Sequence, residues 1–519
     1  MPSVTLPAAA PPLVLALDLG TSSLRALVVD RHGQTVAGTE EQLGYKLRTT
    51  RDGGVEVDAP PLFDLLLRSI DGALDRAGGR ARDIVAIGAT SFWHSLLGLD
   101  QHHQPVTPVL MWADSRSASQ AAALATELDA AALQRRTGCR FHSSYWPAKL
   151  RWLRETHPQV ASRVARWVSF AEYAALRLTG SPHTGVTLSM ASGTGLLDVH
   201  RLRWDDDLLT HLSLTPERLS PLVDVDAGAR LTPEFAQRWS PLAALPWYPA
   251  IGDGAAANVG SGAIGPNRIA LTLGTSGAMR LILPAQSETP AGDFSIPPDL
   301  WAYRLDRDHA VLGGALSNGG NLLRWTRELL GAALDGPAMT AATALPPDAH
   351  GLTMLPFVAG ERSPGWHDGA EGVVAGLTLA TRPEHLLRAA LEAVAYRFAR
   401  LYDALRPLAA PDHQIVANGG AIVNSPAWLG IVADALGHDL LALPAGDEAS
   451  ARGAALVALV AAGVLPDLAA APDPATHADI HHPDSAHHDR YRDGRSRQEQ
   501  LEALLFPAES NDRAAASDS

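Results

Sequence analysis

A short pattern, Leu-Gly-Thr-Ser followed by a small residue, occurs twice in this chain, at 19–23 and again at 273–277. Each copy stands between two short apolar runs, which predicts a β-strand, a tight turn and a second strand. Glycine lets the backbone approach a bulky anion, and the neighbouring hydroxyl and N–H groups can bond phosphate oxygens. A single such turn is most often an ordinary hairpin turn. Two copies in matching contexts favour a duplicated phosphate clamp, which would hold a triphosphate from both sides.

Composition restricts the classes of partner. The 519 residues are 46% hydrophobic and 19% charged, as in an ordinary globular enzyme of two or three domains. The net charge of −14 argues against nucleic acid and anionic membranes as partners. The single cysteine, Cys139, excludes an internal disulfide and favours a cytoplasmic location. We find neither a signal peptide nor an apolar run long enough to cross a membrane.

Apolar spacing and turn residues predict the main elements. We expect helices over 62–77, 255–262, 381–405 and 488–506, a largely helical region over 118–180, and buried strands over 84–89 and 415–417. Residues 240–250 combine three prolines with two aromatic residues, so we place the domain junction there. We expect the two ends, 1–12 and 507–519, to be flexible.

Two aspartates are candidates for chemistry. Asp18 ends the strand before the first turn, where it could hold Mg²⁺ or simply cap the turn. Asp253 lies in Gly252-Asp253-Gly254, ahead of a helix of small residues. A carboxylate there can accept the proton of a substrate hydroxyl as that oxygen attacks a phosphoryl group. The alternative for Asp253 is a plain helix N-cap, and the small residues that follow it favour function.

Other polar groups give weaker signals. Gly320 follows a strand, and Gly420 with Asn424 closes another; such turns can receive a ring or a phosphate, or be ordinary connections. Trp93-His94, with Asp114 and Arg116, would suit a polyhydroxy ligand, although a lone histidine is more often part of a core. The histidines at 481, 482, 487 and 488 could bind a metal, but a solvated connector is the better interpretation.

Taken in order from Leu13 to Leu505, these pieces resemble the FGGY family of carbohydrate kinases, in the actin-like ATPase superfamily. The segments that carry the resemblance are 18–22, 112–116, 252–254, 273–277, 355–357 with 360–364, and 418–421. The resemblance implies an α/β fold with two ribonuclease-H-like domains flanking a catalytic cleft. The N-terminal domain, 13–249, would carry sugar binding and the first phosphate loop. The C-terminal domain, 250–506, would carry ATP binding and the catalytic aspartate.

The resemblance also assigns roles. Asp253 matches the catalytic base, and Asp18 with Asp253 would organise Mg²⁺. ATP would be bound by Thr21, Ser22, Arg25, Gly274, Thr275, Ser276, Gly320, Gly420 and Asn424. The acceptor would meet Trp93, His94, Asp114, Arg116 and Asp253.

The implied reaction transfers the γ-phosphoryl group of MgATP to a terminal hydroxyl. Within the family the segments 94–100, 136–139 and 317–321 are most similar to gluconate kinases, which favours D-gluconate and its conversion to 6-phosphogluconate. Those kinases usually have Met before the histidine, where this chain has Trp93, and the larger ring could reshape the pocket. Lys149 and Arg116 could pair with a sugar acid's carboxylate.

Alternatives remain open at this stage. Xylulose, or another ketose or polyol, is an alternative acceptor. A non-catalytic, nucleotide-gated sugar-binding module is a third interpretation, and it does not explain a polar wall such as Trp93-His94. A homodimer is a further expectation, which the sequence does not decide.

Overall fold

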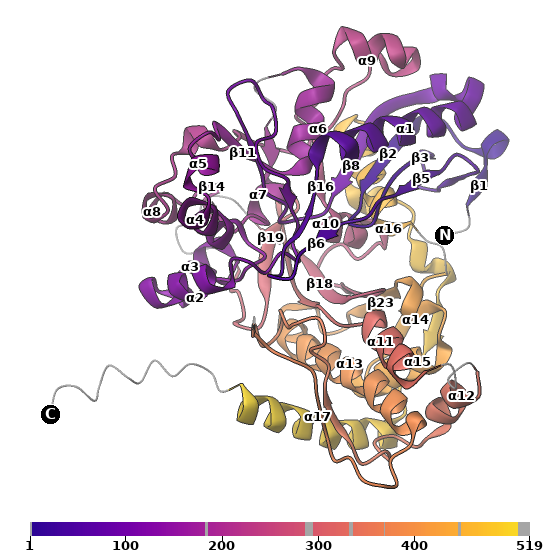
Figure 1. Ribbon diagram of the computed structural model, residues 1–519. Coiled ribbons are helices and arrows are strands. Elements are labelled where there is room, and N and C mark those ends of the chain that lie inside the picture. Colours follow the sequence, from indigo (N-terminus) through magenta and orange to yellow (C-terminus); the bar gives the residue numbers. More distant parts are fainter. Residues whose placement is uncertain are drawn as a thin grey trace, which may run out of the picture.

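Two mixed β-sheets form the framework, one in the upper and one in the lower half of the molecule as drawn in Figure 1. The computed structural model describes residues 3–181, 185–285, 294–331, 336–367, 369–444 and 448–506. The first sheet has five strands in the order β16-β8-β2-β3-β5. In chain order these are β2 (Leu13–Leu19), β3 (Ser23–Val29), β5 (Glu41–Gly44), β8 (Ile84–Ser91) and β16 (Ile251–Gly252).

The second sheet has seven strands in the order β19-β20-β18-β17-β23-β24-β25. They are β17 (Arg268–Leu273), β18 (Gly277–Pro284), β19 (Trp301–Arg304), β20 (His309–Leu316), β23 (Gln414–Asn418), β24 (Leu440–Ala442) and β25 (Asp479–His481).

The second sheet repeats the topology of the first. In each, an antiparallel hairpin (β2–β3 or β17–β18) is extended by a third antiparallel strand on one side. Two parallel strands follow on the other side, β8 and β16 in the first sheet and β23 and β24 in the second. The duplication inferred from one turn therefore extends over five strands of each half. The predicted α/β class with two ribonuclease-H-like domains is confirmed.

Helices cover the first sheet on both faces. Helix α1 (Ala59–Ala77) buries apolar residues at helical spacing against β3, as the sequence predicts. Helix α6 (Phe170–Thr179) contacts β8. Helix α16 (Ala449–Ala461) packs on β2 and β8 and crosses α10 (Asp253–Gly260). At this crossing a side chain on Gly260 would collide with the Ala449 carbonyl, and one on Gly453 with the Ala256 carbonyl. Small residues are thus required where the two helices meet.

Three longer helices accompany the second sheet. Helix α13 (Pro383–Leu405) packs on β18 and β20 and contacts α15 (Pro426–Leu436) and α17 (Ser485–Leu505). The region predicted as largely helical contains α2 (Ala118–Glu127), α3 (Ala130–Thr137) and α4 (Trp146–Thr156), as well as α6. The helix predictions made from apolar spacing are therefore confirmed, with ends displaced by a few residues.

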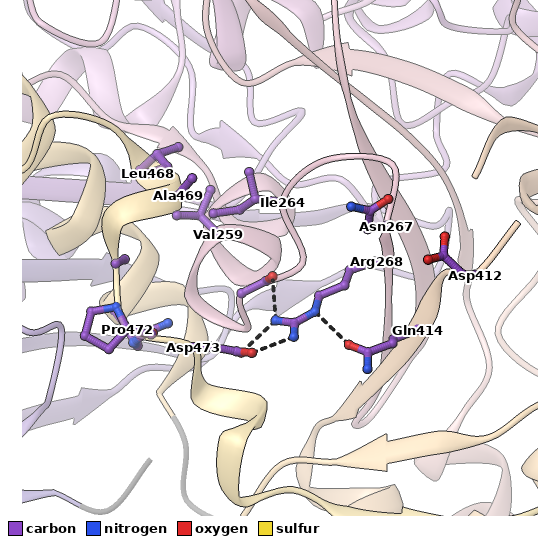
Figure 2. Close-up of a pocket in the computed structure, with 13 residues that line it drawn as sticks. Val259, Ile264, Asn267, Arg268, Asp412, Gln414, Leu468, Ala469, Pro472 and Asp473 are labelled. Carbon is purple, nitrogen blue, oxygen red and sulfur yellow. Dashed lines mark hydrogen bonds and ion pairs between the residues drawn. The ribbon is translucent and has the colours of Figure 1, made fainter. Parts of the chain in front are cut away.

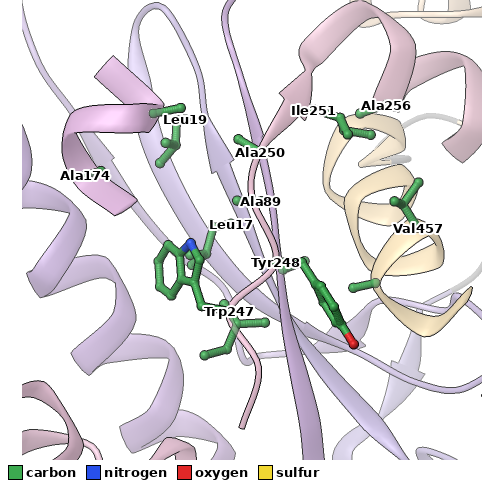
Figure 3. Packing of buried hydrophobic residues seen from close by; sticks show 14 of the residues in the cluster. Leu17, Leu19, Ala89, Ala174, Trp247, Tyr248, Ala250, Ile251, Ala256 and Val457 are labelled. Atoms are coloured by element: carbon green, nitrogen blue, oxygen red, sulfur yellow. The ribbon is translucent and has the colours of Figure 1, made fainter. Parts of the chain in front are cut away.

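The proline-rich segment before residue 250 belongs to the first core. Ile87 donates its N–H to the Pro246 carbonyl at 3.1 Å, and Tyr248 donates to the Ile87 carbonyl at 2.9 Å. Trp247 and Tyr248 are both buried, and Figure 3 shows them pointing to opposite sides of this segment, with Val457 of α16 on the Tyr248 side. The chain continues directly into β16, so the division at 249/250, which stays a prediction, falls just before that strand.

Ordered contacts hold the start of the described chain. Strand β1 (Val4–Thr5) pairs in parallel with β4 (Val36–Ala37), and the Arg80 guanidinium donates to the carbonyls of Leu6 and Ala9 at 2.8 and 2.9 Å. The expectation of a flexible arm is therefore wrong for residues 3–12, because backbone pairing fixes them. The other predicted flexible end, 507–519, lies outside the described residues. Within the described ranges, every helix is too short or too polar to cross a membrane.

Candidate active site

Both repeated turns border the same cavity. Its volume is about 190 Å³, and Thr21 of the first turn and Ser276 of the second are among its lining residues. Each turn closes with one backbone bond of 3.0 Å, from Gly20 to the Ser23 carbonyl and from Gly274 to the Ser276 carbonyl. The structure thus brings together two hairpins that lie about half a chain apart in sequence.

Asp253 lies in this cavity at the first residue of α10. The N-cap of the helix is Gly252, so the plain capping alternative does not describe this aspartate. One carboxylate oxygen accepts the Gly254 N–H at 2.8 Å. Burial raises the pKa of Asp253 above its usual value, while the nearby Arg280 guanidinium opposes that shift. A carboxylate held in this way is a suitable proton acceptor.

Asp18 lies close enough to Asp253 for the two charges to interact. Burial raises the pKa of Asp18 to about 6, Arg25 opposes the shift, and the Asp253 charge adds to it. Arg25 lies opposite Asp18 on β3 and forms ion pairs with Glu40, at 2.9 Å, and with Glu448. Arg25 is therefore already engaged by carboxylates, whereas Ser22 and Thr275 are exposed at the tips of their turns.

Trp93 forms a wall of the cavity. Its indole N–H donates to the Ser189 carbonyl at 2.9 Å, and the ring is buried. A side chain on Gly193, Gly252 or Gly254 would collide with this ring. The three glycines therefore make room for an indole at the position where the sequence departs from the pattern of gluconate kinases.

His94 has a positive φ of 69° and its ring lines the cavity. Its Nδ1 lies 2.5 Å from the Gly193 carbonyl, so Nδ1 carries the hydrogen and Nε2 is an acceptor. Burial lowers the pKa of His94 to about 3, which makes the ring neutral at pH 7. Lys149 donates to the carbonyls of His94 and Met111 at 3.0 and 2.8 Å. Lys149 is fully buried and engaged with backbone, so it does not face an acceptor's carboxylate as the sequence suggested.

Several cavity residues were missed by the sequence analysis. They are Tyr145, Arg280, Trp301, Tyr303 and Trp366, while Trp112 and Arg362 were noted only as parts of motifs. Tyr145 and Tyr303 join two parts of the wall through their hydroxyl groups at 2.7 Å. Trp301 and Tyr303 alternate on β19, so both face the cavity, which is a signal that period-2 spacing could have given.

Asp114 and Arg116 lie elsewhere. The Arg116 guanidinium pairs with Asp114 and with Glu56, each at 2.6 Å, and stacks over Trp152. Neither residue lines the cavity, although their neighbour Trp112 does and donates to Thr21 Oγ1 at 3.3 Å. We therefore do not carry these two predicted substrate contacts, or the suggested pairing of Arg116 with an acceptor carboxylate, into the proposal below.

The remaining predicted nucleotide residues gather behind the second turn. Gly320 begins α11 (Gly320–Leu330) and donates its N–H to the Gly274 carbonyl at 2.9 Å. Gly420 begins α14 (Gly420–Val423), and Asn424 donates to the Gly420 carbonyl at 2.8 Å. Gly320 lies against Ala421, so these two helix starts are adjacent. They surround Gly274 outside the cavity itself, where a nucleotide reaching the turn could extend.

A larger cavity, about 470 Å³, lies near the start of β17 (Figure 2). Arg268 lines this cavity, and its guanidinium group pairs with Asp473 at 2.5 Å and also bonds Gln414 and the Gly262 carbonyl. Because these bonds already engage the Arg268 guanidinium, this residue does not favour a ligand in the cavity.

Potential metal ligands elsewhere in the described residues already bond other side chains. Within the described ranges, the clustered side chains Asp348, His350 and Glu392 are bonded to one another and to Arg388 and Arg497. In the histidine-rich segment, His482 and His487 bond Asp439 and Asp434. These groups do not favour a metal outside the first cavity.

Comparison with family models decides the relationship. The model of the FGGY family of carbohydrate kinases, N-terminal domain, matches residues 13–260, and that of the C-terminal domain matches residues 269–462. The chain belongs to the FGGY family of carbohydrate kinases. It is therefore an ATP-dependent carbohydrate kinase.

Relatives of this FGGY kinase act on different acceptors. A gluconokinase of Bacillus licheniformis is 29% identical over 465 residues, covering 87% of this chain and 88% of the relative. A glycerol kinase of Acidovorax ebreus (strain TPSY) is 30% identical over 466 residues, covering 87% and 91%. The structure of a xylulose kinase from Lactobacillus acidophilus is similar with a TM-score of 0.86 and 26% identity, covering 96% and 99%. The comparisons thus establish the family and leave the acceptor open.

Proposed function

We propose that this FGGY kinase phosphorylates the terminal hydroxyl of a sugar acid, and that its acceptor is D-gluconate, giving 6-phosphogluconate. The observation that carries the proposal is the position of Asp253, which lies in one cavity with Thr21 of the first hairpin and Ser276 of the second. The gluconokinase relative supports the choice of acceptor.

Asp253 acts as the base in this proposal. A hydroxyl oxygen attacks phosphorus readily only as its proton leaves, and a carboxylate within reach can accept that proton in the transition state. Because burial raises the pKa of Asp253, this carboxylate is a better proton acceptor than an exposed aspartate. The proton moves from the acceptor hydroxyl to a carboxylate oxygen, and ADP leaves.

The hairpins hold the phosphates. Thr21 and Ser276 line the cavity, and in this proposal their hydroxyls bond the phosphate oxygens on which charge builds up during transfer. On the acceptor side, neutral His94 presents an Nε2 acceptor to a sugar hydroxyl, and Trp93 shapes the wall. Closure of the two halves around both substrates would exclude water and direct the phosphoryl group to the sugar.

The residues present fit Mg²⁺. Asp18 and Asp253 are carboxylates that raise the free energy of each other's ionised form, and hard oxygen ligands of this kind suit the ion. Mg²⁺ held by Asp18 and Asp253 would neutralise charge on the phosphates of bound ATP. A cytoplasmic location and a homodimer stay predictions.

Xylulose is the second candidate, favoured by the similarity to a xylulose kinase structure over almost the whole chain. The test is ADP release from MgATP with a panel of D-gluconate, D-xylulose, D-ribulose, glycerol and D-glucose. The proposal expects turnover with gluconate at least about tenfold above every neutral acceptor in kcat/KM. Preference for xylulose or glycerol would replace the acceptor and keep the role of Asp253.

A further inference from the structure

Arg362 faces the cavity without a carboxylate partner. Its Nε is buried and makes no hydrogen bond, and among the described residues no ion pair reaches its guanidinium. The nearest acid in sequence, Glu361, is already engaged by Arg397 at 2.6 Å and by the N–H groups of Gly365 and His367. A buried N–H group without a hydrogen bond is costly, so an anionic ligand that accepts from this Nε would be stabilised.

The loop that carries Arg362 holds it rigidly. Ala359 donates its N–H to Asn318 Oδ1 at 3.0 Å, Asn318 donates to the Gly360 carbonyl at 2.8 Å, and Ser363 donates to the Ala315 carbonyl at 3.2 Å. From this loop the guanidinium reaches across the cavity and lies over the Trp112 ring, 4.7 Å from its centroid. Stacking leaves the edge of the planar group free for a ligand with two oxygens.

Arg362 lies on the acceptor side of the cavity. It stacks on Trp112, and its charge acts on Tyr145, Tyr303 and His94, which form the acceptor wall. The Arg362 charge also acts on Asp253, but less strongly than on the two tyrosines. A second arginine, Arg280, lies differently. Its charge acts most strongly on Asp253, and its Nη1 donates to Thr272 of the second hairpin at 3.4 Å. The buried Nε of Arg280 also makes no hydrogen bond, but Arg280 acts on Asp253 more strongly than Arg362 does. Arg280 is therefore the arginine nearer the reacting groups, and Arg362 the one beside the acceptor wall.

We propose that Arg362 binds the carboxylate of an aldonate acceptor and thereby selects sugar acids over neutral sugars. The inference rests on the proposed function, because it assumes a sugar acid with its terminal hydroxyl at Asp253. The carboxylate is at the opposite end of such a chain from that hydroxyl, which agrees with a cation away from the hairpins. Since Trp112 also bonds Thr21, carboxylate binding at Arg362 would draw a loop of the C-terminal half onto the first hairpin.

The test compares D-gluconate with D-glucitol, which has the same carbon chain and a neutral CH₂OH in place of the carboxylate. Steady-state kinetics are measured for the wild type, Arg362→Gln, Arg362→Lys and Arg268→Gln. Arg268 is the matched control, because it is an arginine of the other cavity that is paired with Asp473.

We expect Arg362→Gln to raise the KM for gluconate about 10- to 100-fold, the loss typical of a charge-assisted hydrogen bond. Its kcat with gluconate and its KM for glucitol should change less than about threefold, and Arg362→Lys should restore part of the gluconate affinity. Arg268→Gln should behave as the wild type. Thermal unfolding and MgATP binding confirm that each variant is folded.

Two other outcomes distinguish a failure of this inference from a failure of the proposed function. If the wild type uses gluconate but Arg362→Gln lowers kcat equally for both acceptors, Arg362 acts on the phosphoryl group, which overturns this inference and keeps the proposed function. If the wild type turns over neutral acceptors and no sugar acid, both the proposed function and this inference are wrong.

Discussion

The two hairpins have the same backbone topology and differ in the charge of their side chains. Asp18 and Thr272 each stand two residues before the turn glycine, and each pairs with a parallel strand, at Thr90 and Asn418 respectively. The first hairpin thus carries an acid where the second carries a hydroxyl. The first sheet contributes the Asp18 carboxylate, which suits a metal. The second sheet contributes Arg280, which donates a hydrogen bond to Thr272. The duplicated scaffold therefore supplies two similar turns, which differ in the polar side chain two residues before the turn glycine.

Asp253 is the group that both hairpins face, and its loss should have the largest effect. We expect Asp253→Asn to keep the fold and MgATP binding and to lower kcat about 10³-fold, because the attacking hydroxyl keeps its proton. Nucleotide binding by calorimetry and ADP release measure the two properties. Near-normal turnover by Asp253→Asn would show that another group is the base.

Matched substitutions in the hairpins test their asymmetry. Asp18→Asn should lower kcat about 10²-fold and raise the Mg²⁺ concentration needed for half-maximal rate, because one carboxylate ligand is lost. Thr272→Val, at the equivalent position, should change kcat less than about tenfold and leave the Mg²⁺ requirement unchanged. Equal effects on the Mg²⁺ requirement would contradict the distinct role of the first hairpin.

The dependence of kcat/KM on pH should also show that the first hairpin carries a metal-binding carboxylate. Burial raises the pKa of Asp18 to about 6 and also raises that of Asp253, so these carboxylates gain protons as pH falls toward 6. We expect kcat/KM to fall about tenfold per pH unit on this acid limb, with apparent values that belong to the pair. Higher Mg²⁺ should move the limb to lower pH, because the ion favours the ionised carboxylates. A limb that stays at one pH across Mg²⁺ concentrations would argue against a metal at this pair.

Asp18→Asn should raise the free energy of unfolding although it lowers activity. The pKa of Asp18 is about 6 in the folded protein and 3.8 in the unfolded chain, so ionisation costs stability as pH rises through this interval. Without Mg²⁺ at pH 7, Asp18→Asn should therefore stabilise the protein by about 1–3 kcal/mol, whereas Thr272→Val should not stabilise it. Chemical denaturation of both variants measures this difference, and destabilisation by Asp18→Asn would show that the carboxylate contributes bonds that outweigh its burial.

Local patterns were enough to predict the hairpins and most helices, and they drew attention to Asp253, which lines the cavity. A turn between apolar runs and a Gly-Asp-Gly start of a helix are written in consecutive residues, so no long-range packing is needed to find them. The burial of the proline-rich segment before residue 250 could not be predicted from neighbouring residues, because Trp247 and Tyr248 face opposite sides of it and only the assembled sheet shows this.

The acceptor wall was harder to predict. Asp114 and Arg116 were predicted to join Trp93 and His94 around a polyhydroxy ligand, but the Arg116 side chain pairs with Asp114 and Glu56. Tyr303 and Arg362 come from a strand and a loop that approach Trp93 and Trp112 only when the two halves fold together. Their places depend on contacts between residues some two hundred positions apart, which a pattern of neighbours does not contain.

The central claim is that the two hairpins act as one clamp on one triphosphate, and a double-mutant cycle tests it most directly. The cycle uses Thr21→Ala, Ser276→Ala and the double variant, with kcat/KM for MgATP as the measured quantity. If both hydroxyls contact the same transferring group, the two losses should be non-additive by about 1 kcal/mol or more. Losses that add to within about 0.3 kcal/mol would show that the hairpins act independently and would contradict the clamp.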